Sequence, residues 1–198
     1  MRKKLCALMM TLSLLAGCGG GEAEGTGADE LALNIRTEFL AMTACSFTAD
    51  ITADYGQRVF EYTLEVAWEK DGETVLTVTA PETIAGITAR IADGTTYLEY
   101  DGASLETGPL SGDGLSPMEA VPAILEEICT GCIAACGFET VGEQELLRVV
   151  CREPESTPGT GAEGVFWFDP VTHAPVLAEL MQDGYTVIRC EVTEFTKE

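Results

Sequence analysis

The chain has 198 residues, 46% of them hydrophobic, and carries 33 acidic against 11 basic side chains, for a formal net charge of −22 at pH 7. A charge this negative argues against binding of nucleic acid and against docking of the protein surface on acidic lipids. The length and the hydrophobic content indicate one ordinary domain with a core of its own.

Residues 1–17 have the pattern of a bacterial lipoprotein signal peptide. A basic start precedes an apolar run that is too short to span a bilayer. The run ends in Leu-Ala-Gly-Cys at Cys18, which resembles a lipobox, the signal in which a cysteine sulfur receives a diacylglycerol before cleavage. Cys18 is therefore the expected acyl (palmitate-type) anchor, and residues 18–29 are expected to be a flexible tether.

This signal predicts where the protein lies. A lipid-anchored chain is expected on the outer face of the cytoplasmic membrane, or in the outer membrane if the host has one. The alternative is ordinary secretion with an incidental cysteine at position 18.

Residues 30–198 are expected to form the domain, beginning with a helix. Residues 30–43 place apolar side chains at helical spacing, with Asp29 as the N-cap. Apolar and polar residues then alternate, as in half-buried strands. These alternating stretches are residues 45–54, 60–68, 76–78, 87–91 and 97–100. Asp-Gly pairs at positions 71, 93, 101 and 183 mark tight turns, because both central residues of a type I′ turn take positive φ.

A second helix interrupts the strands. Ser116-Pro117-Met118-Glu119 has the spacing of a capping box with proline at the first helical position. An apolar stripe follows, and Pro122 is expected to bend the helix because its missing amide cannot reach back one turn. Further strands are expected at residues 146–151, 165–169, 176–182 and 185–195.

The element pattern predicts an α+β fold. We expect a curved antiparallel sheet, an unclosed barrel, whose concave face is covered by the N-terminal helix and the inserted helix. This arrangement can enclose an apolar cavity. The candidate lining residues are Phe60, Tyr62, Leu64, Val66, Trp68, Met118, Val121 and Leu125. A large dry space between the sheet and residues 116–128 would favour an apolar ligand, whereas a filled one would favour protein binding.

Three stretches carry a family resemblance: VTAPETIAGI from Val78, LEYDG from Leu98 and LSPMEA from Leu115. They are similar to stretches of the LolA/LolB-like lipoprotein carriers, most of all to the lipid-anchored germination lipoproteins (GerS type) of spore-forming Gram-positive bacteria. The resemblance implies an unclosed β-barrel whose helices cap a hydrophobic hollow for acyl chains. It implies no catalytic residues, and the lipobox matches the anchored relatives rather than a soluble carrier.

Six cysteines lie in the expected domain, where export can oxidise them. Cys151 and Cys190 fall in expected strands and form a candidate disulfide if those strands are neighbours. Cys129, Cys132 and Cys136 have a rival interpretation as a redox or metal site. Against it, the C-x-x-C pair ends a helix instead of starting one, and no paired histidine or second C-x-x-C completes four ligands.

Three functions follow from these patterns. The first is a membrane-anchored, non-enzymatic lipoprotein that binds a lipid or another apolar ligand in a cavity between sheet and helices. The second is an interaction scaffold for an envelope or spore-germination enzyme. The third is a thiol or metal protein that uses Cys129, Cys132 and Cys136. No cofactor is expected, and His173 is expected to be an exposed turn residue.

Overall fold

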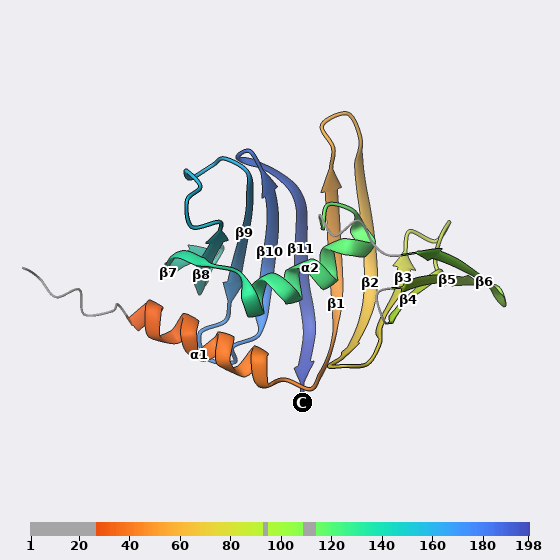
Figure 1. Cartoon of the computed structure of the whole chain (residues 1–198), viewed down its shortest axis with the longest axis horizontal. Helices are drawn as coiled ribbons and strands as arrows, with labels where there is room; N and C mark the ends of the chain where they lie inside the picture. The colour runs from red at the N-terminus through yellow and green to blue at the C-terminus, as the bar shows by residue number, and fades with distance from the viewer. Residues whose placement is uncertain (1–26, 93–94, 109–113) are drawn as a thin grey trace, which may run out of the picture.

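The strands form one open sheet. A computed structural model describes residues 27–92, 95–108 and 114–198. The strand order is β6-β5-β4-β3-β2-β1-β11-β10-β9-β8-β7, with antiparallel neighbours throughout and no closure (Figure 1). The predicted α+β fold with an unclosed antiparallel sheet and two helices is confirmed. In chain order the elements are α1 (Gly27–Ala41), β1 (Ala44–Asp54), β2 (Val59–Glu69), β3 (Thr74–Ala80), β4 (Thr88–Ala92), β5 (Thr95–Tyr100), β6 (Ala103–Gly108), α2 (Pro117–Thr130), β7 (Ile133–Val141), β8 (Gln144–Arg152), β9 (Ala162–Phe168), β10 (Pro175–Gln182) and β11 (Tyr185–Lys197).

The sheet consists of two antiparallel meanders, and the first strand of the chain pairs with the last strand to join them. Strands β1 to β6 pair in chain order, β7 to β11 do the same, and β1 pairs with β11. Since β6 and β7 therefore lie at opposite edges, the segment between them has to cross the sheet, and α2 lies within that segment (Figure 1). Helices α1 and α2 bury their apolar sides in one common core with the sheet. Neither of these two described helices is long and apolar enough to cross a membrane.

Helix α1 begins earlier than the sequence predicts. It starts at Gly27, so residues 27–29 belong to the helix and not to the tether. Asp29 lies in the first turn together with Glu30 and does not cap the helix. Carboxylates in this position are favourable because the N-terminal end of a helix carries partial positive charge. The signal peptide and Cys18 lie outside the described residues.

Helix α2 starts as predicted. Ser116 is the N-cap, and its Oγ accepts a hydrogen bond from the amide of Glu119 at 3.3 Å and donates one to Glu119 Oε2 at 2.8 Å. Pro117 occupies the first turn, and the helix continues through Pro122 to Thr130. The local sequence thus sets the start of the element that has to cross the sheet.

Two of the predicted Asp-Gly turns are confirmed by their backbone angles. Asp101 and Gly102 have φ of 48° and 80°, and Asp183 and Gly184 have φ of 52° and 77°. Positive φ at both central residues is the signature of a type I′ hairpin turn. The predicted turn at positions 93–94 lies outside the described residues. Two strands were not predicted from the sequence, β6 and β7, and these are the two edge strands of the sheet.

Candidate functional site

The predicted cavity-lining residues come from β2 and α2 and belong to the interior of the molecule. Leu64 and Val66 on β2 and Val121 and Leu125 on α2 are buried. Tyr62, Trp68 and Met118 are partly buried against the same core, whereas Phe60 is 37% exposed. Apart from Phe60, these residues therefore pack in or against the core.

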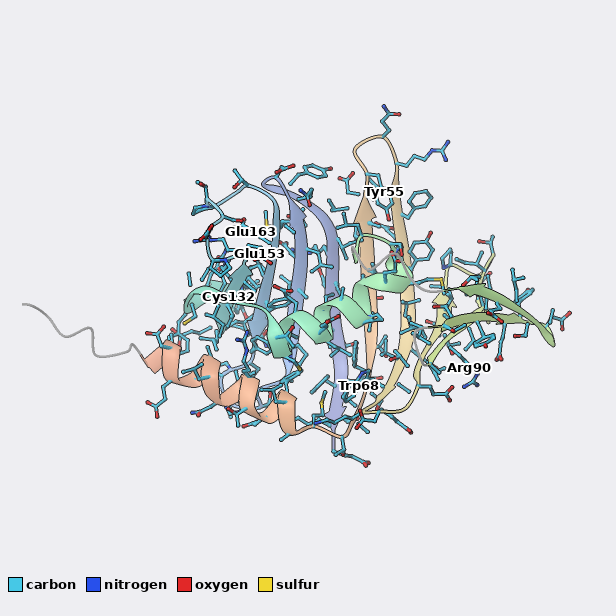
Figure 2. All side chains as sticks on the ribbon, viewed as in Figure 1. Tyr55, Trp68, Arg90, Cys132, Glu153 and Glu163 are labelled. Atoms are coloured by element: carbon cyan, nitrogen blue, oxygen red, sulfur yellow. The ribbon has the colours of Figure 1, made fainter. Side chains whose placement is uncertain are left out.

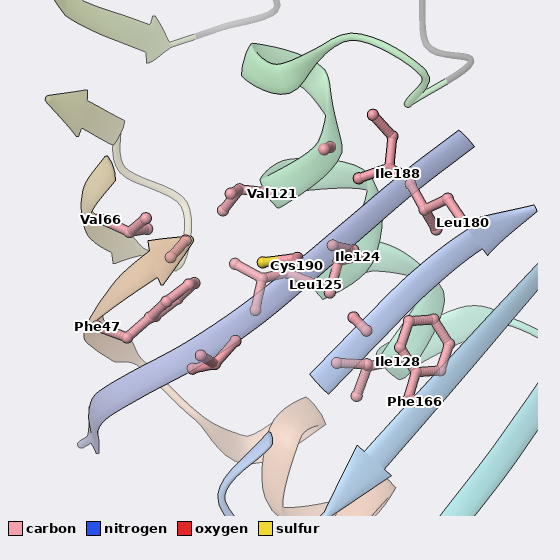
Figure 3. Close-up of a cluster of buried hydrophobic side chains, with 14 of the residues drawn as sticks. Phe47, Val66, Val121, Ile124, Leu125, Ile128, Phe166, Leu180, Ile188 and Cys190 are labelled. Carbon is pink, nitrogen blue, oxygen red and sulfur yellow. The ribbon is translucent and has the colours of Figure 1, made fainter. Parts of the chain in front are cut away.

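Side chains fill the space between α2 and the sheet. Val121, Ile124, Leu125 and Ile128 point from the helix towards the strands, where they pack in one cluster with Phe166 of β9, Leu180 of β10 and Ile188 and Cys190 of β11 (Figure 3). Completely buried alanines on the inner face allow the helix to lie close to the strands. They are Ala49 and Ala53 on β1 and Ala178 on β10.

A void beside this cluster is too small for a ligand. It has a volume of about 10 Å³ and lies between α1, the end of α2 and strands β7 to β9, lined in part by Ile35, Ile128 and Phe166. A space of this size holds at most one water molecule, whereas ligand pockets measure about 300–1,000 Å³. Among the described residues, the lining residues predicted for a lipid cavity thus form a packed core.

Larger hollows lie on the outer face of the sheet, and they are open and polar. One has a volume of about 430 Å³ and is bordered by Asp50, Glu61, Thr63 and Arg189. A second, of about 330 Å³, is bordered by Thr48, Glu65 and Thr77 among others. Carboxylate and hydroxyl groups of this kind do not favour an acyl chain, because burying them against hydrocarbon leaves their hydrogen bonds unmade.

An exposed aromatic cluster lies at the free end of the β1–β2 hairpin. The ring of Phe60 is 6.0 Å from that of Tyr55 and 6.4 Å from that of Tyr62, measured between centroids. Tyr55 is 45% exposed and donates a hydrogen bond from its hydroxyl to the carbonyl of Leu115 at 2.7 Å. Figure 2 shows Tyr55 close to the hairpin loop. Tyr55 was not among the predicted lining residues, although Tyr55, Phe60 and Tyr62 fall within eight residues around a glycine turn.

The predicted disulfide between Cys151 and Cys190 is wrong for this fold. Cys151 is on β8 and Cys190 on β11, and β9 and β10 lie between them. Three strand spacings amount to roughly 14 Å, whereas bridged cysteines have Cα atoms at most about 7 Å apart. All six cysteines between residues 27 and 198 are free thiols in the structure.

Four thiols of the domain are poorly suited to redox chemistry. Burial raises the pKa of Cys45 and of Cys190 to about 12, and that of Cys151 to about 11. Burial and a hydrogen bond of 2.9 Å to Asp29 raise the pKa of Cys136 to about 11. Since the thiolate is the reactive form, raised pKa values make these groups weak nucleophiles. Within residues 27–92, 95–108 and 114–198, no group of three or more His, Cys, Asp or Glu side chains is placed to hold a metal ion.

We expect alkylation to distinguish the thiols by their burial. Cys132 is exposed, so iodoacetamide should label it first in the native protein, with the partly exposed Cys129 and Cys136 following more slowly. After denaturation without reductant, all six cysteines of the domain should take up the label, as read by peptide mass spectrometry. A pair that stays unlabelled until a reductant is added would contradict the free-thiol state.

His173 links the sheet to α1. Its Nδ1 is 2.8 Å from a carboxylate oxygen of Glu38, which also pairs with the Lys197 ammonium. The hydrogen bonds from Lys197 and His173 lower the pKa of Glu38. Since these contacts join α1, the β9–β10 turn and the end of β11, the lone histidine serves to hold the helix against the sheet.

Comparison with known proteins gives a likeness in fold. No family model matches the sequence, and no curated protein matches it. An uncharacterised conserved protein from Thermus thermophilus superposes with a TM-score of 0.50 at 12% identity, over 85% of this chain and 86% of that one. A LolA superfamily protein from Nitrosomonas europaea has a TM-score of 0.43 at 10% identity, over 86% and 93% of the two chains. A structure of the CwlD amidase from Clostridioides difficile in complex with the GerS lipoprotein gives 0.45 at 13%, over 86% and 95%.

The superposition on the Thermus thermophilus protein covers most of both chains. At identities this low, the likeness is one of architecture: an open antiparallel sheet with helices on one face. A shared architecture does not define a function, which depends on the residues of the site.

Proposed function

We propose that this chain is a lipid-anchored protein of the bacterial envelope whose domain binds another protein and does not carry a lipid. The filled space between α2 and the sheet supports this most directly. A carrier needs room for at least one acyl chain, whereas the void in the core between α1, the end of α2 and strands β7 to β9 measures only about 10 Å³. The core residues of α2 instead hold the scaffold rigid.

Anchoring rests on the sequence signal at Cys18, which lies shortly before α1. Two or more acyl chains hold a protein stably on a bilayer, since each buried methylene contributes about 0.8 kcal/mol. The strongly negative domain is repelled by acidic lipid headgroups, so the anchor and not the protein surface would provide membrane attachment.

The aromatic cluster of Tyr55, Phe60 and Tyr62 is the proposed contact surface. Exposed tyrosine and phenylalanine side chains contribute large contact areas at protein interfaces, and few rotamers have to be frozen to use them. The ring of Phe60 contacts those of both Tyr55 and Tyr62, and the Tyr55 hydroxyl is hydrogen-bonded to Leu115, so the surface is already organised before binding. The acidic domain around it favours a partner with a basic rim.

Photo-crosslinking in the native host tests this surface. A photoreactive residue at position 60 should yield a discrete higher-mass product. The same residue at position 171, where Val171 is 86% exposed and outside the cluster, should yield none. The product should weaken when Tyr55→Ser is added, because that change removes one ring and its hydrogen bond to Leu115. Equal products at both positions, or none at position 60, would rule out the aromatic cluster as the contact surface.

A further inference from the structure

Strand β6 is an open edge of the sheet. Its residues from Ala103 to Thr107 are all exposed, and within the described ranges its only partner strand is β5. It lies at the opposite end of the domain from the start of α1, which follows the proposed anchor (Figure 1). A row of backbone amides and carbonyls is thus presented away from the point of membrane attachment.

The hairpin turn determines which backbone groups of β6 point outward. Tyr100 and Ala103 pair across the two-residue Asp101–Gly102 loop, so these two residues exchange both of their hydrogen bonds. The hydrogen-bonded pairs alternate along an antiparallel ladder, so Leu105 also bonds inward, to Leu98. The amides and carbonyls of Ser104 and Glu106 therefore face outward, where an added strand can pair with them.

A row of paired apolar side chains on the inner face of the sheet ends with an exposed side chain at this edge. Leu76 on β3 pairs with Ala89 on β4, Ala89 with Leu98 on β5, and Leu98 with Leu105 on β6. Leu76 and Ala89 are 1% and 0% exposed, whereas Leu105 is 63% exposed. An apolar side chain on an added strand, opposite Leu105, would continue the row and cover it.

The opposite edge of the sheet differs from β6. Strand β7 lies against α1, and the Cys136 thiol on β7 donates a hydrogen bond to Asp29 of that helix. Strand β6 contains no lysine and no proline, two residues that prevent edge pairing, and its one charged residue is Glu106. Its pairing with β5 is regular from Ala103 to Glu106, and the register shifts only beyond Glu106. On an acidic chain this carboxylate disfavours a second copy and favours a basic side chain beside it.

We infer that β6 binds an extended segment of another protein, added as a twelfth strand, whose side chains alternate between apolar and basic. The apolar side chains pack beside Leu105 on the inner face, and the basic ones lie beside Glu106 on the outer face. This inference rests on the proposed protein-binding function, but it concerns a surface distinct from the aromatic cluster.

A pair of synthetic peptides of equal composition tests the edge. The first alternates valine and lysine, and the second groups the valines and lysines in two blocks. Titrated into the mature chain made without its leader and with Cys18→Ser (residues 18–198), the alternating peptide should bind and protect the amides of Ser104 and Glu106 from hydrogen exchange. Equal binding of both peptides would mean that charge attraction alone explains the binding, and this would overturn the inference.

Two substitutions at one position separate backbone pairing from side-chain contact. Ser104→Pro removes an outward amide without touching the bonds to β5, and should weaken binding of the alternating peptide by about tenfold or more. Ser104→Ala keeps the amide and should bind as the parent does. Circular dichroism checks that both variants fold. Equal binding of the two variants would overturn the inference.

Two further outcomes bear on the occupant of the edge. If the parent dimerises in sedimentation and Ser104→Pro does not, a second copy pairs with β6 and the inference of a different protein is wrong. If position 60 crosslinks but the alternating peptide does not bind, the edge inference fails while the proposed function stands.

Discussion

Cys18→Ser should abolish the acylated, membrane-bound form of the protein. A hydroxyl cannot take the place of the thiol in forming the thioether to diacylglycerol, so no lipid-modified product is expected. The wild-type chain should fractionate with membranes at a mass that reflects removal of residues 1–17 and addition of acyl chains. The variant should lose that species, leaving an unprocessed or a soluble chain. Membrane fractionation, intact-mass measurement and incorporation of labelled palmitate compare the wild-type chain with the variant.

Cys6→Ser is the matched control, because Cys6 lies in the same predicted leader but outside the predicted lipobox. It should leave acylation and fractionation unchanged. If the Cys18→Ser chain still fractionated with membranes at the wild-type mass, the lipobox interpretation and the localisation built on it would be wrong.

Phe166→Ala should cost about 3–5 kcal/mol of the free energy of unfolding. Phe166 is 1% exposed on the inner face of β9, among the residues that contact α2, and truncation removes contacts on all sides of its ring. Chemical denaturation of the mature Cys18→Ser chain measures the change.

Phe138→Ala is the matched control for Phe166→Ala. Phe138 lies on edge strand β7 and is 49% exposed, so its truncation should cost no more than about 1 kcal/mol. A loss below about 1 kcal/mol for Phe166→Ala as well would mean that the interior is loosely packed.

The same reasoning predicts how the unmodified interior treats lipids. With a void of about 10 Å³, the parent should show no stoichiometric uptake of a fluorescent fatty acid and a single apo mass in native mass spectrometry. Uptake at one ligand per chain would show that α2 opens away from the sheet, and would restore the lipid-carrier function in place of protein binding.

Local chemistry explains which elements the sequence could predict. Alternating side chains identified most strands, and the Asp101–Gly102 turn and the Ser116 cap were readable because each depends on residues within four positions. Edge strands β6 and β7 escaped prediction because a strand with one free edge and little burial needs no strict alternation.

The candidate site depends on contacts between distant segments, which the sequence does not reveal. The sequence found the apolar faces of β2 and α2, but whether they enclose a hollow depends on how closely the helix lies. Small buried side chains on strands far apart in sequence, such as Ala49 and Ala178, favour a close approach of the helix. The Cys151–Cys190 pairing failed for a related reason, because neighbouring strands were assumed and the sheet order separates them by β9 and β10.

The sequence by itself determined the class of fold and the starts of its helices and turns to within a few residues, and it predicts an export signal that ends at Cys18. Each of these follows from interactions between residues close together in the chain. Only the tertiary structure decided that β1 pairs with β11, that α2 fills the concave face, and that the edge of β6 stays open. These features depend on contacts between segments far apart in the chain, such as the hydrogen bond between Ser46 and Thr196, which are 150 residues apart, and no local pattern encodes such contacts.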